Sequence, residues 1–386
     1  MRVKSNWFRE AINLIKKERL KELDVLRAIA FIFVVEQHTM GGYSNIKGIS
    51  CFYYEIFKFF YTFAKPAVAV FLCISAISLS YVYLNEFNYK KYYIKRIKYI
   101  YIPYIIWSII YSFNSGQANN FSNSFIQILA GNACFHLWYM GMIIRLLLYF
   151  PIILWVAKKI HNQNIKLRIV VLITLILSYY EVSKYQNIIS DKLIHFIFNN
   201  PTEIQEKIVN ISPLFWFLYF VLGIYICLNY ENFKTKILKF KIPVMITYML
   251  LFIYAYLNEM DKVKFVRSLS LLYFVFTILF WYILSVSLSS KIKVYNCFNF
   301  ISKFSFASYL AHVLVVSRVV NDVRLYFHDW LIVGLITWIT TSLLTPLLIK
   351  FISYIPYSQF ITGVNGTQYG SKSKKAYKNS YQEAVH

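Results

Sequence analysis

The sequence predicts an all-α integral membrane protein with about ten transmembrane helices and both termini in the cytoplasm. Of its 386 residues, 58% are hydrophobic and only 15% are charged, whereas a typical soluble domain is about 25% charged. This composition excludes a disordered protein, a disulfide scaffold and an ordinary cytosolic enzyme. Ten segments approach the ~20 apolar residues that a helix needs to cross a membrane: 25–41, 59–83, 99–113, 137–157, 168–180, 212–229, 242–257, 268–289, 304–320 and 330–355.

The distribution of Lys and Arg agrees with ten spans. If the N-terminus is cytoplasmic, the predicted inside segments carry 28 of the 41 Lys and Arg residues, and the outside loops carry 9. Cytoplasmic loops of membrane proteins carry an excess of Lys and Arg, so both ends are predicted to lie inside. The other four basic residues lie within or at the edge of a span: Arg27, Lys65, Arg145 and Arg318.

We interpret the net charge of +24 as a sign of membrane topology. A basic balance can indicate nucleic-acid binding, but the apolar content favours the lipid bilayer of the cell membrane as the partner, and no nucleic acid. The five cysteines have no CxxC or metal-ligand spacing, so no metal is expected. No HExxH, P-loop, GxGxxG or GxSxG motif occurs in the required context, which leaves metal-dependent, nucleotide-hydrolysing and serine-hydrolase chemistry without support.

The chain divides into three predicted parts. Residues 1–23 form a basic arm whose apolar residues recur at helical spacing, as in an amphipathic helix that lies on anionic lipid. Residues 24–356 form the multi-pass membrane domain. Residues 357–386 are rich in Gly, Ser, Lys and Asn and are expected to form a flexible, basic cytoplasmic tail. Function is therefore expected among the helices.

Ionisable residues are costly inside a membrane span and are candidate functional residues. The first span contains Asp24, Arg27, Glu36 and His38. Arg27 and His38 are eleven residues apart, which puts them on nearly the same helix face and roughly 16 Å apart along the axis. Arg can bind a phosphate through its planar guanidinium, and His can act as a general base near neutral pH. The pair suits a ligand with an anionic head and a distant reactive end; the alternative is a snorkelling Arg and a His that caps the helix.

Two further spans carry basic residues that need an explanation. Arg96 and Lys98 open the third span and are candidates for phosphate contacts, although basic anchoring at the cytoplasmic side is the alternative. Arg145 lies near mid-membrane and needs a partner. Glu36 is the acid expected to pair with it, in a structural or a catalytic pair.

Three uncharged or weakly basic residues complete the candidates. Ser75 is either a small packing residue between helices or a hydrogen-bond donor in a cavity. Trp138 stands at the start of a span, where the aromatic belt at the membrane surface is expected. His312 lies within the ninth predicted span, where we expect it to orient a neighbour rather than to perform chemistry.

The order of these residues resembles the membrane acyltransferase-3 family from about residue 20 to residue 355. The most specific part is a Leu-Asp-x-Leu-Arg-Ala-x-Ala run followed by a His eleven residues after the Arg. The sequence departs from the family pattern at Ala76-Ile77, where members often have Gly-Phe, and at Lys98, where many have Arg. The resemblance is carried by Leu23, Asp24, Leu26, Arg27, Ala28, Ala30 and His38, by Phe71 and Ser75, by Arg96-Ile97-Lys98 and Pro103, by Leu137-Trp138-Tyr139, and by Ser305 and Tyr309-Leu310-Ala311-His312.

The resemblance implies an O-acyltransferase that moves an acyl group from cytoplasmic acyl-CoA to a hydroxyl of a cell-surface or exported polysaccharide. Acetyl is the expected acyl group, with succinyl as the alternative, and acyl-CoA is a co-substrate. Three stretches, 95–104, 215–233 and 304–312, are most similar to the intercellular-adhesin acyltransferases, which are thought to modify poly-N-acetylglucosamine. A glycan acceptor is thus an implied partner, and a polysaccharide synthase is a second candidate partner.

The resemblance also implies roles for individual residues. The phosphates of CoA would contact Arg27, Arg96 and Lys98. His38 would either deprotonate the acceptor hydroxyl or carry the acyl group. Arg27 and Asp24 are further catalytic candidates, and Asp24, one turn from Arg27, would hold its guanidinium in place. Glu36 is also a catalytic candidate and Arg145 a candidate lining residue of a substrate cavity, although neither belongs to the family pattern. The other candidate lining residues are Ser75, Trp138, Tyr309 and His312. Trp138 would stack on a sugar, with the aromatic belt at the membrane surface as the alternative.

Two functions from other classes remain as alternatives. An exporter or flippase for a polysaccharide or a lipid-linked sugar would also have many helices and a polar channel. Paired Gly/Pro breaks in two halves of the chain would favour transport, and we find none in the sequence. A scaffold for a glycan synthase would leave the charged residues within the membrane without a role.

Overall fold

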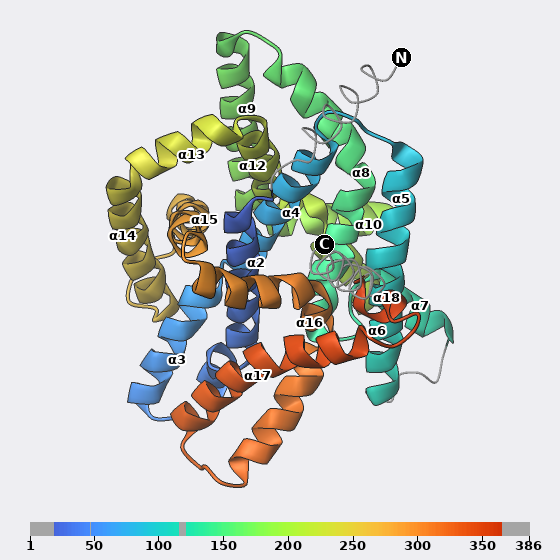
Figure 1. The fold of residues 1–386 in the computed structure, drawn as a ribbon, viewed down its shortest axis with the longest axis vertical. Helices are drawn as coiled ribbons and strands as arrows, with labels where there is room; N and C mark the ends of the chain where they lie inside the picture. The colour runs from blue at the N-terminus through green and yellow to red at the C-terminus, as the bar shows by residue number, and fades with distance from the viewer. Residues whose placement is uncertain (1–18, 47, 116–120, 365–386) are drawn as a thin grey trace, which may run out of the picture.

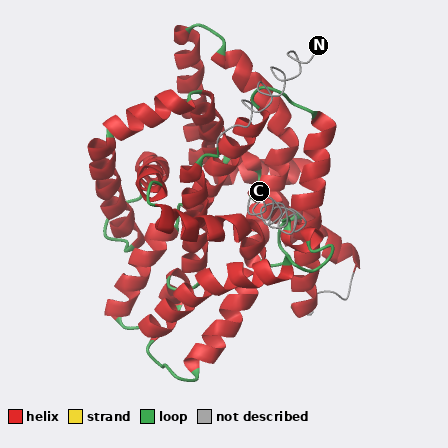
Figure 2. Ribbon diagram, viewed as in Figure 1, coloured by secondary structure: helices red, strands yellow, loops and turns green. Residues whose placement is uncertain are grey.

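The protein is built entirely of helices in the ranges that its computed structural model describes, residues 19–46, 48–115 and 121–364 (Figures 1 and 2). The all-α prediction is confirmed for these ranges. Most of the predicted amphipathic arm and most of the predicted tail lie outside them. The first described helix, α2, begins at Lys21, close to the predicted start of the membrane domain.

The first half of the described chain runs from α2 to α8. Their bounds are α2 Lys21–His38, η1 Gly41–Asn45, α3 Cys51–Ala64, α4 Ala67–Tyr83, α5 Tyr89–Arg96, η2 Ile97–Tyr101, α6 Ile102–Asn114, α7 Phe121–Leu129, η4 Phe135–Leu137 and α8 Trp138–His161. The second half contains α9 Ile165–Lys184, α10 Gln186–Ile197, α11 Glu203–Asn210, η5 Pro213–Phe215, α12 Phe217–Leu228, α13 Tyr230–Lys239, α14 Lys241–Glu259, α15 Arg267–Ser289, α16 Ile292–Arg324, α17 Trp330–Ile352 and α18 Gln359–Thr362.

Six helical segments of the described chain are long and apolar enough to cross a membrane, which supports a multi-pass membrane protein. They are Cys51–Tyr83, Phe135–His161, Lys241–Glu259, Arg267–Ser289, Ile292–Arg324 and Trp330–Ile352. The other four predicted spans also fall on helices, but α6 and α12 are short, while α2 and α9 carry several charged residues. The exact count of ten and the orientation of the termini stay predictions.

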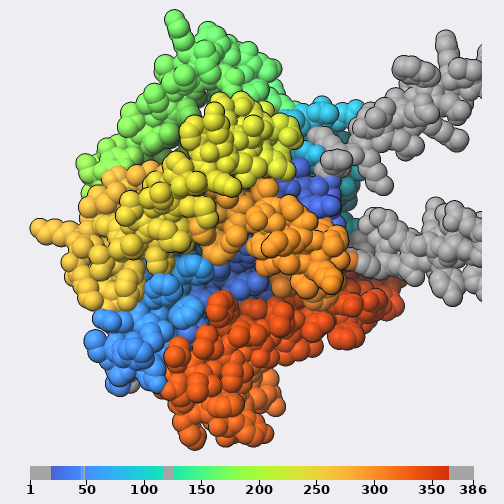
Figure 3. Space-filling view, turned by 60° about the vertical axis from the view of Figure 1, so that its left-hand side comes forward, coloured from blue at the N-terminus to red at the C-terminus, as the bar shows by residue number. Residues whose placement is uncertain are grey.

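Helix α2 lies at the centre of the bundle and packs against α16, α15, α4 and α3 (Figure 1). Its small residues Ala28 and Ala30 are fully buried, so neighbouring helices can approach closely. Around this centre, α13 and α14 (yellow) lie on the outside of the molecule, between the green region that contains α9 and the blue α3 (Figure 3). Of the charged residues of α2, Glu22, Asp24 and Glu36 are buried inside the protein.

Close packing of α12 against α4 depends on a glycine. A Cβ atom on Gly223 would lie 2.4 Å from the backbone oxygen of Cys73 and 2.7 Å from the Cβ of Ala76. These distances are far below van der Waals contact, so only glycine allows this approach. Helix α4, which carries Ser75 and Ser78, is thereby held in position beside α2.

The third predicted span is one continuous helical run, α5–η2–α6, with a π-helical segment at Ile97–Tyr101. Such segments often occur at functional sites.

The segment that follows Tyr357, predicted as the start of a flexible tail, instead begins with the packed helix α18. The indole Nε1 of Trp107 donates a hydrogen bond to the backbone oxygen of Ile361 (3.0 Å), and Gly363 ends α18 in the left-handed region (φ 64°) against Tyr99.

Candidate active site

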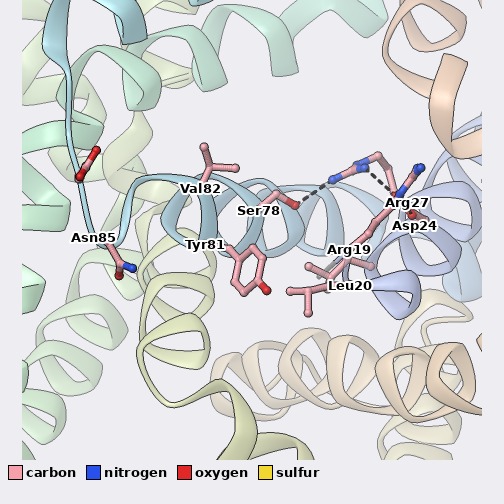
Figure 4. A pocket seen from close by; sticks show the side chains of 10 residues that line it. Arg19, Leu20, Asp24, Arg27, Ser78, Tyr81, Val82 and Asn85 are labelled. Atoms are coloured by element: carbon pink, nitrogen blue, oxygen red, sulfur yellow. Dashed lines mark hydrogen bonds and ion pairs between the residues drawn. The ribbon is translucent and has the colours of Figure 1, made fainter. Parts of the chain in front are cut away.

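The N-terminal half of α2 opens onto a pocket of about 630 Å³ (Figure 4). Arg27 projects toward α4, where its Nη2 donates a hydrogen bond to Ser78 Oγ (2.8 Å). Its Nη1 lies 3.6 Å from Asp24 Oδ1. The pocket is lined by Arg19, Leu20, Leu23, Asp24, Arg27, Ser78, Tyr81, Val82, Asn85 and Glu86.

Asp24 positions two arginines at this pocket. The Nε of Arg19 lies 2.6 Å from Asp24 Oδ2, and the Tyr295 hydroxyl donates to the same oxygen (3.2 Å). The Asp24 carboxylate is buried. Its charge needs partners there, and the hydrogen bonds and the two guanidinium cations supply them. This agrees with the expectation that Asp24 holds the guanidinium of Arg27, and it leaves the two guanidiniums where a phosphate could bind both.

A second, inner cavity of about 280 Å³ begins on the other side of Arg27. Ser75, Arg96 and Tyr139 all line it, so three helical segments far apart in the sequence meet there. The Arg96 guanidinium lies 5.4 Å from the ring centre of Tyr92, and its buried Nε has no hydrogen-bond partner among the described residues. Arg27 and Arg96, the two residues expected to bind phosphate, thus line one cavity.

Lys98 is placed differently from Arg96. Its Nζ lies 5.5 Å from the ring centres of both Tyr99 and Phe360. It lines neither the outer nor the inner pocket. Lys98 lies two residues beyond Arg96. Because a helix turns by about 100° per residue, its side chain points to another side of the helical run α5–η2–α6.

Three imidazoles form a cluster at the C-terminal end of α2. The ring centre of His38 lies 5.3 Å from that of His312 and 6.4 Å from that of His136, and the rings of His136 and His312 are 4.9 Å apart. His38 is half-buried, whereas His136 and His312 are at most 1% exposed. The cluster joins α2, η4 and α16, with Phe135 against the His38 ring at 5.0 Å.

The two buried imidazoles each have one nitrogen without a partner among the described residues. In His312, Nδ1 lies 2.6 Å from the backbone oxygen of Tyr309, so Nδ1 carries the proton and Nε2 is the unpartnered nitrogen. In His136, Nε2 lies 3.4 Å from the Leu310 oxygen and Nδ1 is unpartnered. Buried polar atoms normally have partners, so these two nitrogens could bind a water molecule or a polar group of a ligand.

Tyr309 and Tyr139 connect the cluster with the inner cavity. The Tyr309 hydroxyl donates a hydrogen bond to the backbone oxygen of His136. Its ring centre lies 5.7 Å from those of His136 and His312, and 5.5 Å from that of Tyr139. Because Tyr139 also lines the inner cavity, the Arg27 end of α2 and the His38 end are joined by a continuous set of contacts.

Sequence reasoning missed His136. The residue stands directly before the Leu137-Trp138-Tyr139 element that was singled out, at the outer end of a predicted span. The available signal was that His38 and His136 both stand at the predicted outer end of a span, and so at a similar predicted depth. The η4 turn Phe135–Leu137 brings it to His38, and a turn of this kind is not visible in hydropathy.

The expected pair between Glu36 and Arg145 is wrong. Arg145 donates hydrogen bonds to the backbone oxygens of Ile208 (2.6 Å) and Leu129 (3.2 Å). Both carboxylate oxygens of the fully buried Glu36 lack a partner among the described residues. Residues two positions apart on a helix point to nearly opposite sides, so Glu36 lies on another side of α2 from His38.

Trp138 does not line either of these two cavities. Its ring packs against that of Trp216, with 5.3 Å between the centres. In the described part of the chain, no group of three or more His, Cys, Asp or Glu side chains has an arrangement that could hold a metal ion.

The fold and this site define a multi-pass membrane protein with a pocket that contains two arginines at one end of a central helix and a histidine cluster at the other. A family model described as "Acyltransferase domain" matches residues 20–354. The chain therefore belongs to the membrane acyltransferase-3 family, and Arg27, Arg96, His38 and His312 all lie within the matched region.

The chain is also similar to curated proteins named "Probable poly-beta-1,6-N-acetyl-D-glucosamine export protein". It is 28% identical over 323 residues to the protein of Staphylococcus aureus (strain NCTC 8325 / PS 47), covering 78% of this chain and 83% of the relative. It is 24% identical over 320 residues to the Staphylococcus epidermidis protein, covering 78% and 82%. No solved structure shows a significant match.

Proposed function

We propose that this protein is a membrane O-acyltransferase that moves an acyl group from cytoplasmic acyl-CoA to a hydroxyl of an exported or cell-surface polysaccharide. Acetyl is the acyl group we expect, with succinyl as the alternative. The observation that carries the proposal is the position of α2, because Arg27 lines the outer pocket at one end and His38 belongs to the imidazole cluster at the other. Poly-N-acetylglucosamine is the first candidate acceptor, from the names of the relatives.

The proposed binding step uses the basic end of α2. Arg27, Arg19 and Arg96 surround the outer and inner cavities, and guanidinium groups bind phosphate through paired hydrogen bonds. The phosphates of CoA would remain here. The pantetheine arm would extend through the inner cavity past Tyr139 and bring the thioester toward His38.

The proposed chemical step is an acyl transfer in which His38 acts as a general base. Its unprotonated nitrogen takes the proton of the acceptor hydroxyl while the oxygen attacks the thioester carbonyl. The C–S bond then breaks, the protonated His38 gives its proton to the leaving CoA sulfur, and the ester remains on the glycan. A covalent acyl group on His38 is the alternative route to the same product. The unpartnered nitrogens of His136 and His312 accept hydrogen bonds and would hold a water beside the acceptor hydroxyl.

The proposal is tested in a polysaccharide-producing strain whose own copy of this protein is deleted. Cells complemented with wild type, His38→Ala or the exposed-histidine control His328→Ala are compared at equal protein levels in the membrane. We expect His38→Ala to lower the ester content of the polymer by about 100-fold or more with normal export, and His328→Ala to resemble wild type. Mass spectrometry of the acid released by base identifies the acyl group.

An exporter is the second candidate function, because the relatives are named export proteins. It predicts the opposite result for the same strains. Polymer on the cell surface would fall in His38→Ala, while the ester content of the remaining polymer would stay unchanged. That outcome would overturn the acyltransferase proposal.

A further inference from the structure

An apolar groove lies on the outer surface of the bundle, between α9, α12 and α15. It has a volume of about 360 Å³ and is lined almost entirely by aliphatic and aromatic side chains, among them Leu172, Ile176, Leu218, Val221, Leu271 and Val275. None of its lining residues belongs to the candidate active site. The groove is therefore a separate feature of the molecule.

The groove continues toward the loop that joins α8 and α9. A smaller hollow of about 80 Å³ shares Leu172, Leu175, Val221 and Tyr225 with it. The end of this hollow is lined by His161, the last residue of α8, and by Arg168, in the first turn of α9. The apolar groove thus ends at a cationic side chain.

The surroundings of Arg168 are strongly basic. Residues 158–168 contain four Lys and Arg residues and no acidic residue. Asn229 accepts a hydrogen bond from Arg168 Nη2 (3.3 Å) and so helps to hold the guanidinium. Lys159 Nζ lies 4.0 Å from the ring centre of Trp155, an exposed aromatic of α8. An anion at this end of the groove would meet Arg168, in a loop that carries three lysines and no carboxylate.

Helix α9 itself leaves apolar surface uncovered. Leu172 and Ile176, which line the groove, are 36% and 47% exposed. An acyl chain in the groove would cover these two side chains. The chain would gain the dispersion energy of close contacts along the groove.

We propose that this groove is a binding site for an anionic phospholipid, with its phosphate at Arg168 and one acyl chain between α9, α12 and α15. A groove that is apolar along its length and cationic at one end matches an amphiphile with a negative head. Basic pockets between helices near the cytoplasmic surface bind acidic lipid head groups in this way. The inference does not depend on the acyltransferase activity.

The site is tested on the full-length protein, purified in detergent and depleted of lipid. Binding of phosphatidylglycerol is measured by native mass spectrometry and by the rise in melting temperature on lipid addition. Phosphatidylcholine and inorganic phosphate are the comparison ligands. We expect phosphatidylglycerol to bind and to stabilise the protein more than phosphatidylcholine, and inorganic phosphate to have no effect, because the head and the chain are both needed.

Two variants and a matched control locate the site. Arg168→Gln should weaken phosphatidylglycerol binding by about fivefold, the effect of one interfacial cation. Lys236→Gln removes one exposed charge from α13 and should leave binding unchanged. Val221→Trp fills the place where the groove and the hollow meet and should weaken binding of both phospholipids.

Three results would overturn the inference. The first is equal loss of binding in Arg168→Gln and Lys236→Gln, which would indicate a general charge effect. The second is equal stabilisation by both phospholipids in the wild type. The third is unchanged lipid binding in Val221→Trp. The melting temperature of each variant without lipid shows whether the variant is folded. If Arg168→Gln is misfolded, Arg168→Lys, which retains the charge, supplies a second test.

Discussion

The three imidazoles of the cluster differ in their contacts, and the difference predicts what each contributes. His38 is half-buried and makes no hydrogen bond to a described residue, whereas His136 and His312 are buried and held by backbone oxygens of α16. A residue that must meet a substrate needs access, so His38 is the candidate base. The two buried rings are candidate positioning residues for the acceptor hydroxyl or for a water.

His136→Gln is the sharpest test at this scale. We expect the maximal rate of acyl transfer to fall by about 10- to 100-fold, because a positioned polar group near the base is lost, while the KM for acyl-CoA stays within about twofold. The pH at half-maximal rate should also shift, since the neighbour of His38 has changed. These values are measured with purified protein in proteoliposomes. The exposed His195→Gln on α10 is the control, and a changed KM with an unchanged maximal rate would contradict the assignment.

At the scale of the element, the contact between α4 and α12 holds part of the site in place. Gly223 lets α12 approach the backbone of α4 at Cys73, two residues before Ser75 and five before Ser78. Gly223→Val forces the two helices apart, and we expect a loss of about 2 kcal/mol in stability, as for other overpacked interfaces. Thermal unfolding in detergent measures this. Gly42→Ala, whose added Cβ would find only an ordinary contact at 3.6 Å, should melt as wild type does; equal melting of both variants would show that the interface is not tightly packed.

The elements were predicted far better than their side-chain partners. Every predicted span falls on a helix because a long apolar run leaves few other ways to satisfy backbone hydrogen bonds in a membrane. Hydropathy does not report which way a side chain points. Lys98 therefore lies against Phe360 instead of beside Arg96, and Arg145 bonds to backbone oxygens instead of to Glu36.

For the whole molecule, the charge pattern predicts which loops face the cytoplasm. In a background with the five native cysteines replaced by serine, we expect the Lys192→Cys variant to react with a membrane-impermeant maleimide in intact cells. The Lys236→Cys variant should react only after the membrane is permeabilised, because α13 belongs to a basic inside segment. Labelling of both variants in intact cells would contradict the ten-span topology.

The sequence by itself determined the helical membrane fold and the distance between Arg27 and His38. Both are local properties, because composition sets the solvent that a segment prefers and a single helix fixes the rise between its own residues. Tertiary structure alone decided that His136 and His312 meet His38, and that Arg96 shares a cavity with Arg27. These residues lie on helices far apart in the chain, and their contacts depend on how helices rotate and approach one another, as where Gly223 allows α12 to touch α4.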